Sequence, residues 1–160
     1  MAPPAPLVAL TANLAVDRTL RLDRRLARGH LHRVRDVREL AGGKGVNLAR
    51  AVRALGGETR VAGFLAGHNG EKVRRLLADD GLDGVFEPVE GETRECHALL
   101  DDTGHPTEVN EPGPTVPESA WRRLLARLPA GRLVIAGSLP PGIDTGLFAR
   151  LIASLPESPS

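Results

Sequence analysis

The sequence predicts an α/β fold in which a mostly parallel sheet is flanked by helices. Short apolar runs alternate along the chain with segments whose apolar residues recur at helical spacing, the element order typical of parallel sheets. Glycine, proline or a capping residue stands at most boundaries between them. The composition agrees, because 41% of the 160 residues are hydrophobic and 26% are charged, as in a globular domain and unlike a disordered chain.

Local patterns define the elements of the first third. Residues 7–11 are expected to form a short buried strand that enters a turn at Asn13. Apolar residues within 18–40 are spaced by two and by three, so strand and helix remain alternatives there. A helix is expected from Gly45 to the glycines at 56 and 57, with one apolar face formed by Val46, Ala49, Val52 and Leu55.

The middle of the chain continues the alternation. A strand at 60–65 is followed by a helix that Asn69 can cap and Gly81 can end, with Val73, Leu76 and Leu77 on its apolar face. A short strand is expected at 85–89. Two further strands, at 95–100 and 107–109, flank the sequence Asp-Asp-Thr-Gly-His-Pro, which is typical of a hairpin turn.

The last third predicts two helices around one strand. Thr115 and Glu118 fit a capping box with Pro117 in the first turn, and the helix behind it should bury Trp121, Leu124, Leu125 and Leu128. An apolar strand at 133–136 leads into a rigid turn at 137–142. Asp144 should cap a final helix whose inward residues are Leu147, Phe148, Leu151 and Ile152. The polar tail 156–160 is expected to be disordered.

Charge and cysteine content argue against several functional classes. The first 60 residues hold twelve Arg or Lys against five Asp or Glu, but no aromatic residues accompany them for base stacking. No apolar run approaches the roughly 20 residues of a membrane span, and no basic segment leads into an apolar stretch as in a secretory signal. The single cysteine, Cys96, fits a reducing cytosol. We expect a cytoplasmic protein without nucleic-acid or membrane partners.

Three turns lie at the carboxyl ends of expected strands, where parallel sheets bind ligands. They span 13–17, 41–47 and 137–142, and we expect them to converge. The sequence Gly42-Gly-Lys-Gly45 precedes a helix, so backbone N–H groups, the helix N-terminus and the Lys44 charge would suit an anion. A bare helix-entry turn is the alternative, because glycine runs of this kind are common.

Side chains in and near these turns have chemistry that suits a sugar or a phosphate. The Asp17 carboxylate accepts hydrogen bonds from hydroxyl groups, and the Asn47 amide both donates and accepts. Arg94 can bind a phosphate with two N–H groups, and the stiff turn holding Ser138 fixes a hydroxyl without the surroundings of a nucleophile. The alternatives are a turn aspartate bonded to its own backbone and a surface arginine.

The histidines do not predict a metal site. None of the five has the spacing of a known metal-binding motif. His30 and His32 would face the same side of a strand and could contact an anionic substrate, although solvated histidines are at least as common.

Taken together, five motifs resemble those of the phosphofructokinase B (pfkB) family of ribokinase-like carbohydrate kinases, in particular its branch of 1-phosphofructokinases and tagatose-6-phosphate kinases. They follow one another in the family's order and cover essentially the whole chain. The motifs are Asn13-Leu-Ala-Val-Asp17, Ala41-Gly-Gly-Lys-Gly-Val-Asn47, Glu92-Thr-Arg94, Thr107-Glu-Val-Asn-Glu-Pro-Gly-Pro114 and Gly137-Ser-Leu-Pro-Pro-Gly142. The resemblance implies a ribokinase-like fold with a small β-lid formed by segments of about 18–40 and 94–110.

The resemblance also implies roles for individual residues. The acceptor sugar would be oriented by Asp17, Gly42, Gly43 and Asn47, and its existing phosphate would be held by Lys44 and Arg94, with Ser138 lining the same pocket. The candidate lid contacts are His30, His32 and Asn110. Leu14 replaces the family's proline, which should loosen the turn without removing Asp17.

The implied reaction is phosphorylation of a hexose monophosphate by ATP with Mg²⁺, with fructose 1-phosphate as the preferred acceptor. The family's Gly-Ala-Gly-Asp motif, which supplies the general base and the nucleotide anion hole, does not occur in these 160 residues. We therefore expect a truncated kinase: residues 1–160 form the acceptor-binding half, no catalytic residue is present, and ATP and Mg²⁺ bind only to the intact enzyme. A homodimer through the lid is a further expectation, and a non-catalytic sugar-phosphate-binding module is the alternative function.

Overall fold

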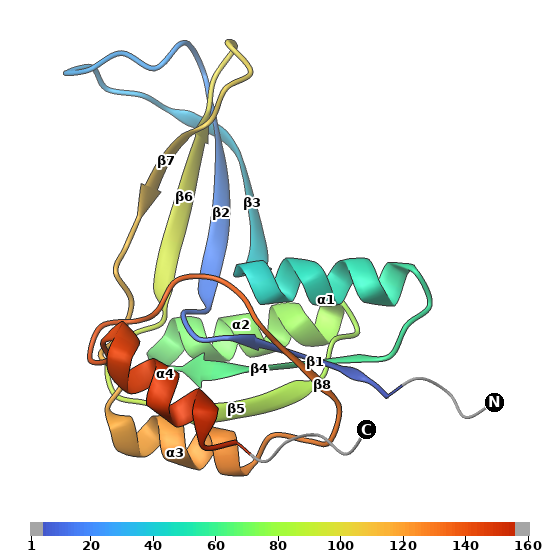
Figure 1. Ribbon diagram of the computed structural model, residues 1–160. Coiled ribbons are helices and arrows are strands. Elements are labelled where there is room, and N and C mark those ends of the chain that lie inside the picture. Colours follow the sequence, from blue (N-terminus) through green and yellow to red (C-terminus); the bar gives the residue numbers. More distant parts are fainter. Residues whose placement is uncertain (1–4, 156–160) are drawn as a thin grey trace.

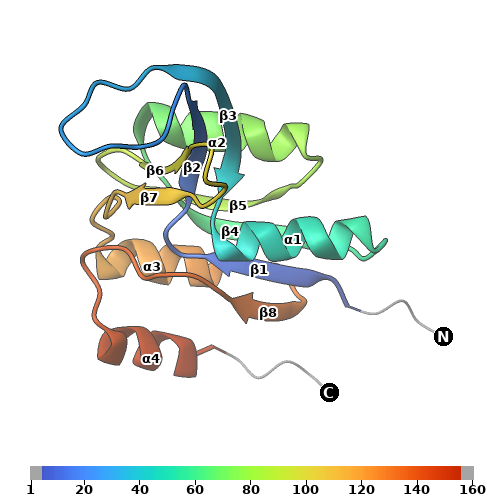
Figure 2. The ribbon, with the colours of Figure 1, turned by 90° about the horizontal axis from the view of Figure 1, so that it is seen from above.

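A computed structural model describes residues 5–155, which form two four-stranded sheets and four helices (Figure 1). The main sheet is entirely parallel, with the order β5-β4-β1-β8, as Figure 2 shows from above. Its strands are β1 (Leu7–Thr11), β4 (Thr59–Leu65), β5 (Gly84–Pro88) and β8 (Arg132–Ile135). The prediction of an α/β fold with a mostly parallel sheet is confirmed. The predicted disordered tail, 156–160, lies outside the described residues.

Helices cover both faces of the main sheet. They are α1 (Lys44–Ala54) and α2 (Gly67–Asp79) on one face, and α3 (Glu118–Ala126) and α4 (Thr145–Ala153) on the other. Two buried clusters follow, because alternate residues of β1 point to opposite faces: Ala9 packs toward α1 and α2, whereas Val8 and Leu10 pack toward α3 and α4. Trp121 is fully buried in the second cluster, as predicted.

The segment 18–40, where strand and helix were alternatives, forms two strands of a second sheet. This outer sheet has the order β3-β2-β6-β7 and stands away from the main sheet (Figure 1). Its strands are β2 (Ala15–Leu22), β3 (Val34–Gly42), β6 (Arg94–Leu100) and β7 (Thr107–Asn110). β2 runs parallel to β6, and the other two pairs are antiparallel, including the predicted hairpin of β6 and β7.

Ion pairs hold the inner end of the outer sheet against α2. Arg18 Nε lies 3.0 Å from Glu39 Oε1, and Arg18 Nη1 lies 3.1 Å from Glu95 Oε2, so three neighbouring strands are joined. Lys72 of α2 lies 2.7 Å from Glu39 and links that network to the body. Half-exposed pairs contribute about 1 kcal/mol or less each, so the network orients the sheet more than it stabilises the fold.

Two predicted helix starts are wrong. Asn69 does not cap α2, which begins at Gly67 after Ala66. The caps come instead from residues remote in sequence: the Glu92 carboxylate accepts from Asn69 N–H, and Thr93 Oγ1 accepts from Ala66 N–H at 2.8 Å. The capping box of Thr115 and Glu118 does not form either, because Pro117 occupies the position before the helix and no side chain caps it.

Of the other predictions about helix ends and helix faces, two are confirmed and one is wrong. Asp144 caps α4 by accepting from Leu147 N–H at 2.7 Å, and Gly81 follows α2 with φ +65°, as expected for a helix stop. Leu55 does not belong to the apolar face of α1, because it follows the helix and is 88% exposed. None of the helices in the described range is long and apolar enough to cross a membrane.

Candidate functional site

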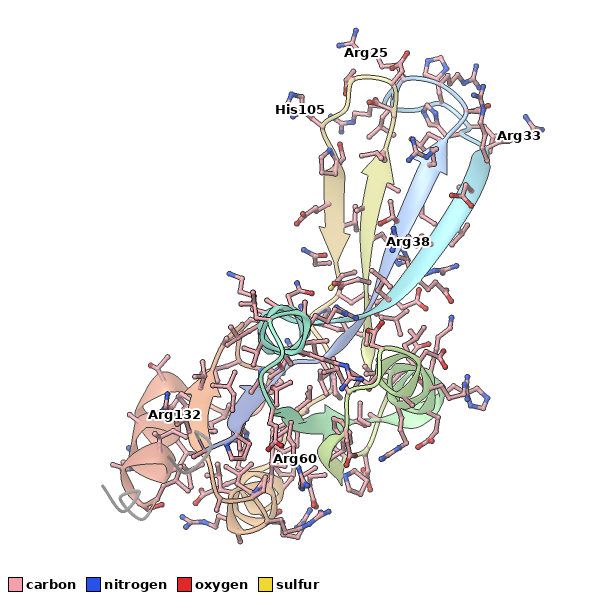
Figure 3. The ribbon with its side chains drawn as sticks, turned by 90° about the vertical axis from the view of Figure 1, so that its right-hand side faces the viewer. Arg25, Arg33, Arg38, Arg60, His105 and Arg132 are labelled. Atoms are coloured by element: carbon pink, nitrogen blue, oxygen red, sulfur yellow. The ribbon has the colours of Figure 1, made fainter. Side chains whose placement is uncertain are left out.

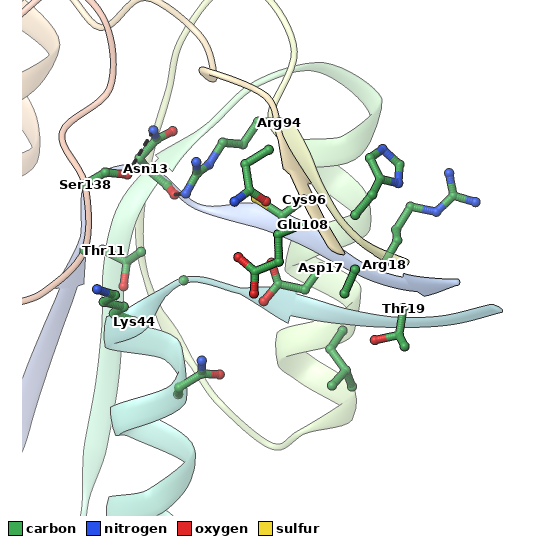
Figure 4. A pocket seen from close by; sticks show the side chains of 17 residues that line it. Thr11, Asn13, Asp17, Arg18, Thr19, Lys44, Arg94, Cys96, Glu108 and Ser138 are labelled. Atoms are coloured by element: carbon green, nitrogen blue, oxygen red, sulfur yellow. Dashed lines mark hydrogen bonds between the residues drawn. The ribbon is translucent and has the colours of Figure 1, made fainter. Parts of the chain in front are cut away.

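A cavity of about 650 Å³ opens between the carboxyl ends of the main-sheet strands and the inner end of the outer sheet (Figure 4). The three turns at 13–17, 41–47 and 137–142 all contribute to its lining, so the predicted convergence is confirmed. Seven of the residues selected from the sequence line it, namely Asp17, Gly43, Lys44, Asn47, Arg94, Asn110 and Ser138. The cavity is therefore built by segments that are far apart in the chain.

Asp17 projects from β2 into this cavity. Its carboxyl group occupies the space that a Cβ would fill at Gly42, two residues beyond Leu40, the residue of β3 that pairs with Asp17. Burial raises the pKa of Asp17 above its ordinary value, and the charges of Arg94 and Arg50 partly oppose that rise. The carboxylate has lost part of its contact with water, so a hydrogen bond donated by a ligand would stabilise it.

The start of α1 forms a second wall. Gly43 precedes the helix with φ +123°, and no side chain caps the first turn, so its N–H groups are available to an anion. Lys44 adds a positive charge at the same edge, as Figure 4 shows. In the first turn, Asn47 Oδ1 accepts from Arg50 Nη1 at 2.9 Å, which leaves the Asn47 N–H₂ group free to donate into the cavity.

Arg94 makes no direct ion pair with an acidic side chain of the described residues, and its hydrogen-bond acceptors are main-chain carbonyls. Its Nη2 donates to the Asn13 carbonyl at 3.1 Å and its Nη1 donates to the Glu111 carbonyl at 3.3 Å. Both acceptors are neutral main-chain groups, and Nε is buried without a partner. A guanidinium held in this way is oriented without a carboxylate in direct contact, which favours an anionic ligand.

The histidines predicted as lid contacts lie elsewhere. His30 and His32 belong to the exposed connection between β2 and β3, where His32 Nε2 bonds to the backbone of Ala27. Arg25 and Arg33 mark this outer end of the sheet in Figure 3, far from the cavity at its base. The structure therefore brings Asn110, but neither histidine, into the cavity of the same chain.

Ten lining residues were not selected from the sequence, and three of them, Thr11, Asn13 and Glu108, bear most directly on the site. Thr11 is 1% exposed and its hydroxyl has no partner, Asn13 bridges two turns, and the Glu108 carboxylate faces that of Asp17 in Figure 4. Glu108 could have been predicted, because it lies two residues before Asn110 on the same strand, and residues at this spacing share one face. Thr11 ends a buried strand and gave no such signal.

The chemistry of the lining suits binding better than nucleophilic attack. Burial raises the pKa of the Cys96 thiol, so it is not an activated thiolate. Within residues 5–155, no three His, Cys, Asp or Glu side chains gather as ligands of a metal ion. The carboxylates of Asp17 and Glu108 line the same cavity as the cationic groups of Lys44 and Arg94, so one cavity offers acceptors for hydroxyl groups and donors for an anion.

Comparison with known proteins agrees with this geometry. The family model described as "pfkB family carbohydrate kinase" matches residues 6–158. The 1-phosphofructokinase of Haloferax volcanii is 35% identical over 148 residues, which are 91% of this chain and 48% of that protein. The chain thus spans about half the length of this curated relative.

Solved structures give the same result. Phosphofructokinase-2 from Escherichia coli in complex with fructose-6-phosphate superposes with a TM-score of 0.87 at 26% identity, covering 94% of this chain and 51% of that one. A possible 1-phosphofructokinase from Thermotoga maritima gives a TM-score of 0.77 at 28% identity, covering 92% and 49%. The ribokinase-like fold is therefore shared along nearly the whole chain.

Proposed function

The chain belongs to the pfkB family of carbohydrate kinases, and we propose that its 160 residues form the acceptor-binding side of such a kinase. In this proposal the cavity binds a hexose monophosphate, with fructose 1-phosphate as the preferred ligand. The choice is supported by the 1-phosphofructokinase relative and by the residues that line the cavity. The outer sheet, with segments 18–40 and 94–110, acts as the lid over the bound sugar.

The observation that carries the proposal is that Arg94, which has no carboxylate in direct contact, lines one cavity with Ser138 and Lys44. These groups are proposed to hold the phosphate of the sugar, because guanidinium and hydroxyl donors suit phosphate oxygens. The sugar hydroxyl groups are proposed to bond to the Asp17 carboxylate, the Asn47 amide and the backbone of Gly42 and Gly43.

Phosphoryl transfer from ATP with Mg²⁺ is proposed for the intact enzyme only. Transfer depends on stabilising the charge of the moving phosphoryl group, and the sequence contains no Gly-Ala-Gly-Asp motif to provide the general base and anion hole. The free edge of β8, which pairs only with β1 among the described strands, is proposed to receive the nucleotide-binding segment.

Calorimetry with fructose 1-phosphate tests the binding proposal without requiring turnover. We expect saturable heat with the wild-type chain, and a loss of affinity of about tenfold or more in Arg94→Met, which keeps a long side chain but removes the charge. Arg60→Met, on β4 and away from the cavity, is the control (Figure 3). Absence of saturable heat in the wild type would contradict the proposal.

An ADP-release assay separates the half-kinase from the alternative sugar-phosphate-binding module. The chain with MgATP and fructose 1-phosphate should release no ADP above background. Steady ADP formation would show that these residues are catalytically sufficient. If binding occurs but no supplied nucleotide-binding segment restores turnover, the binding module is favoured.

Homodimerisation through the outer sheet is a separate proposal, supported by an apolar face. Val37 and Val109 are 45% and 55% exposed, and the register places Leu20 and Leu99 on the same face as these two residues. The crystal structure of a tetrameric inhibited form of the Escherichia coli phosphofructokinase-2 shows that this relative assembles. Val109→Glu should convert a dimer to a monomer in analytical ultracentrifugation, and a monomeric wild type would contradict the proposal.

A further inference from the structure

On the basis of the proposed sugar-phosphate site, we infer that Asn13 is a positioning residue whose side-chain amide orients the Ser138 hydroxyl toward the ligand's phosphate. Asn13 lies in the turn between β1 and β2 and is only 5% exposed. It lines the main cavity and also a neighbouring cavity of about 560 Å³, and Arg94 and Ser138 line both. Asn13 is therefore part of the wall from which the two phosphate-side groups project.

The orientation of the Asn13 amide is fixed by its surroundings. Its Nδ2 donates to the Pro112 carbonyl at 3.0 Å, and a carbonyl can only accept, so the nitrogen rather than the oxygen faces this loop. The same Nδ2 donates to Ser138 Oγ at 3.4 Å. The amide oxygen packs against Gly113, where φ is +91° and a Cβ would collide with it. Turning the amide over would place its oxygen against the Pro112 carbonyl oxygen and lose this hydrogen bond.

This arrangement determines which way the Ser138 hydroxyl points. A serine hydroxyl has one hydrogen to donate and two lone pairs that accept. Because Asn13 Nδ2–H occupies a lone pair of Ser138 Oγ, the hydroxyl hydrogen remains available to donate into the cavity. A phosphate oxygen is an acceptor, so the amide presents Ser138 to it as a donor.

The main chain of the same residue positions Arg94. The Asn13 carbonyl accepts from Arg94 Nη2 at 3.1 Å, whereas the side chain acts on Ser138. A change confined to the Asn13 side chain leaves the carbonyl contact with Arg94 in place. Such a change also removes the bond to the Pro112 carbonyl, so its effect on Ser138 is isolated only by comparing Ser138→Ala in the two backgrounds.

A double-mutant cycle of Asn13→Asp and Ser138→Ala tests the inference. The N13D side chain has nearly the same shape, but its carboxylate accepts the hydroxyl hydrogen of Ser138 and turns it away from the ligand. In the wild type, S138A should weaken binding of fructose 1-phosphate about tenfold, as expected for loss of a hydrogen bond to a charged group. In the N13D background, S138A should change the affinity by less than about twofold. The added negative charge is present in both arms of that comparison and cancels.

Asn69→Asp is the matched control, because Asn69 Nδ2 also donates to a carbonyl at 3.0 Å, that of Thr93, but does not line the cavity. In N69D, S138A should keep its tenfold effect. A tenfold effect of S138A in N13D as well would overturn the inference. If circular dichroism shows that N13D does not fold, Asn13→Ala replaces it, with an expected S138A effect below about threefold.

The same cycle with inorganic phosphate separates this inference from the proposed function. If the wild type binds phosphate without preferring fructose 1-phosphate, the proposed ligand fails, and the phosphate cycle still decides the role of Asn13. If it binds fructose 1-phosphate but the cycle is additive, only the role of Asn13 fails. If it binds neither ligand, both are overturned.

Discussion

At the scale of single residues, the site and the stability of the fold compete at Asp17. Burial raises its pKa, so the folded chain holds this proton more tightly than the unfolded chain does. Stability therefore falls as the pH rises through the interval between the ordinary pKa of an aspartate and the raised value. In the folded chain the ionised form of Asp17 is therefore the destabilised one, and a ligand that donates hydrogen bonds to the carboxylate would offset that cost.

Asp17→Asn should consequently separate stability from binding. We expect the unfolding temperature at pH 7 to rise, because the neutral amide has no charge to desolvate. The loss of stability that the wild type shows between acidic and neutral pH should be smaller in this variant. Affinity for fructose 1-phosphate should fall about tenfold or more, since the amide is a weaker acceptor for hydroxyl groups. Asp102→Asn, in the exposed turn between β6 and β7, should change neither quantity. Lower stability of D17N at pH 7 would contradict this account.

Residue chemistry explains what could be predicted of the site. Asp17, Lys44, Arg94 and Ser138 stand in short motifs whose residue types indicate sugar or phosphate binding, and the fold brings all four to one cavity. Asn13 opens one of these motifs, but its proposed role depends on a contact with Ser138 across 125 positions of the chain. Patterns within a short stretch of sequence carry no information about contacts between residues so far apart in the chain.

At the scale of elements, the motif Glu92-Thr93-Arg94 combines support and binding. Glu92 and Thr93 bond to N–H groups at the start of α2, and Arg94 then enters the cavity as the first residue of β6. The distant origin of these caps also explains why the prediction of Asn69 as the cap was wrong. Local sequence identifies a residue that is able to cap a helix. The carboxylate that caps α2 belongs to Glu92, which lies 23 positions from Asn69.

Glu92→Ala should destabilise the protein by about 1 kcal/mol, the usual cost of losing a helix cap. The measurement is urea unfolding at pH 7, with the slope against denaturant unchanged. Glu90→Ala, at an exposed position in the same connection, is the matched control and should be neutral. Because Glu92 does not line the cavity, affinity for fructose 1-phosphate should stay within about twofold. An E92A protein as stable as E90A would show that the carboxylate does not cap α2.

In the outer sheet too, some strands could be predicted from neighbouring residues and others depend on distant partners. The hairpin of β6 and β7 was predictable because its turn sequence lies between its strands. The segment 18–40 remained ambiguous because β2 becomes a central strand only through its parallel partner β6, which lies more than seventy residues further on. Pairing with a distant strand, rather than intrinsic preference, decides that segment.

At the scale of the whole molecule, β8 is the element that limits the main sheet. Among the described strands it pairs only with β1, at one edge of the sheet. Leu133 and Ile135 pack toward α3 and α4, whereas Val134 faces the other side and stays half-exposed beside fully buried Ala9. An unpaired parallel edge with uncovered apolar surface is a place where another segment can add.

Complementation tests that proposal for the whole molecule. Mixing this chain with the part of the Haloferax volcanii 1-phosphofructokinase that the alignment does not cover should produce ADP from MgATP and fructose 1-phosphate. Val134→Glu should lower that rate about tenfold or more at equal concentrations, because a charge would be buried where the added segment packs. Leu55→Glu, at a position 88% exposed just after α1, is the control and should leave the rate unchanged. Since V134E leaves the cavity intact, it should still bind fructose 1-phosphate alone. Equal turnover of V134E and wild type would place the docking surface elsewhere than on β8.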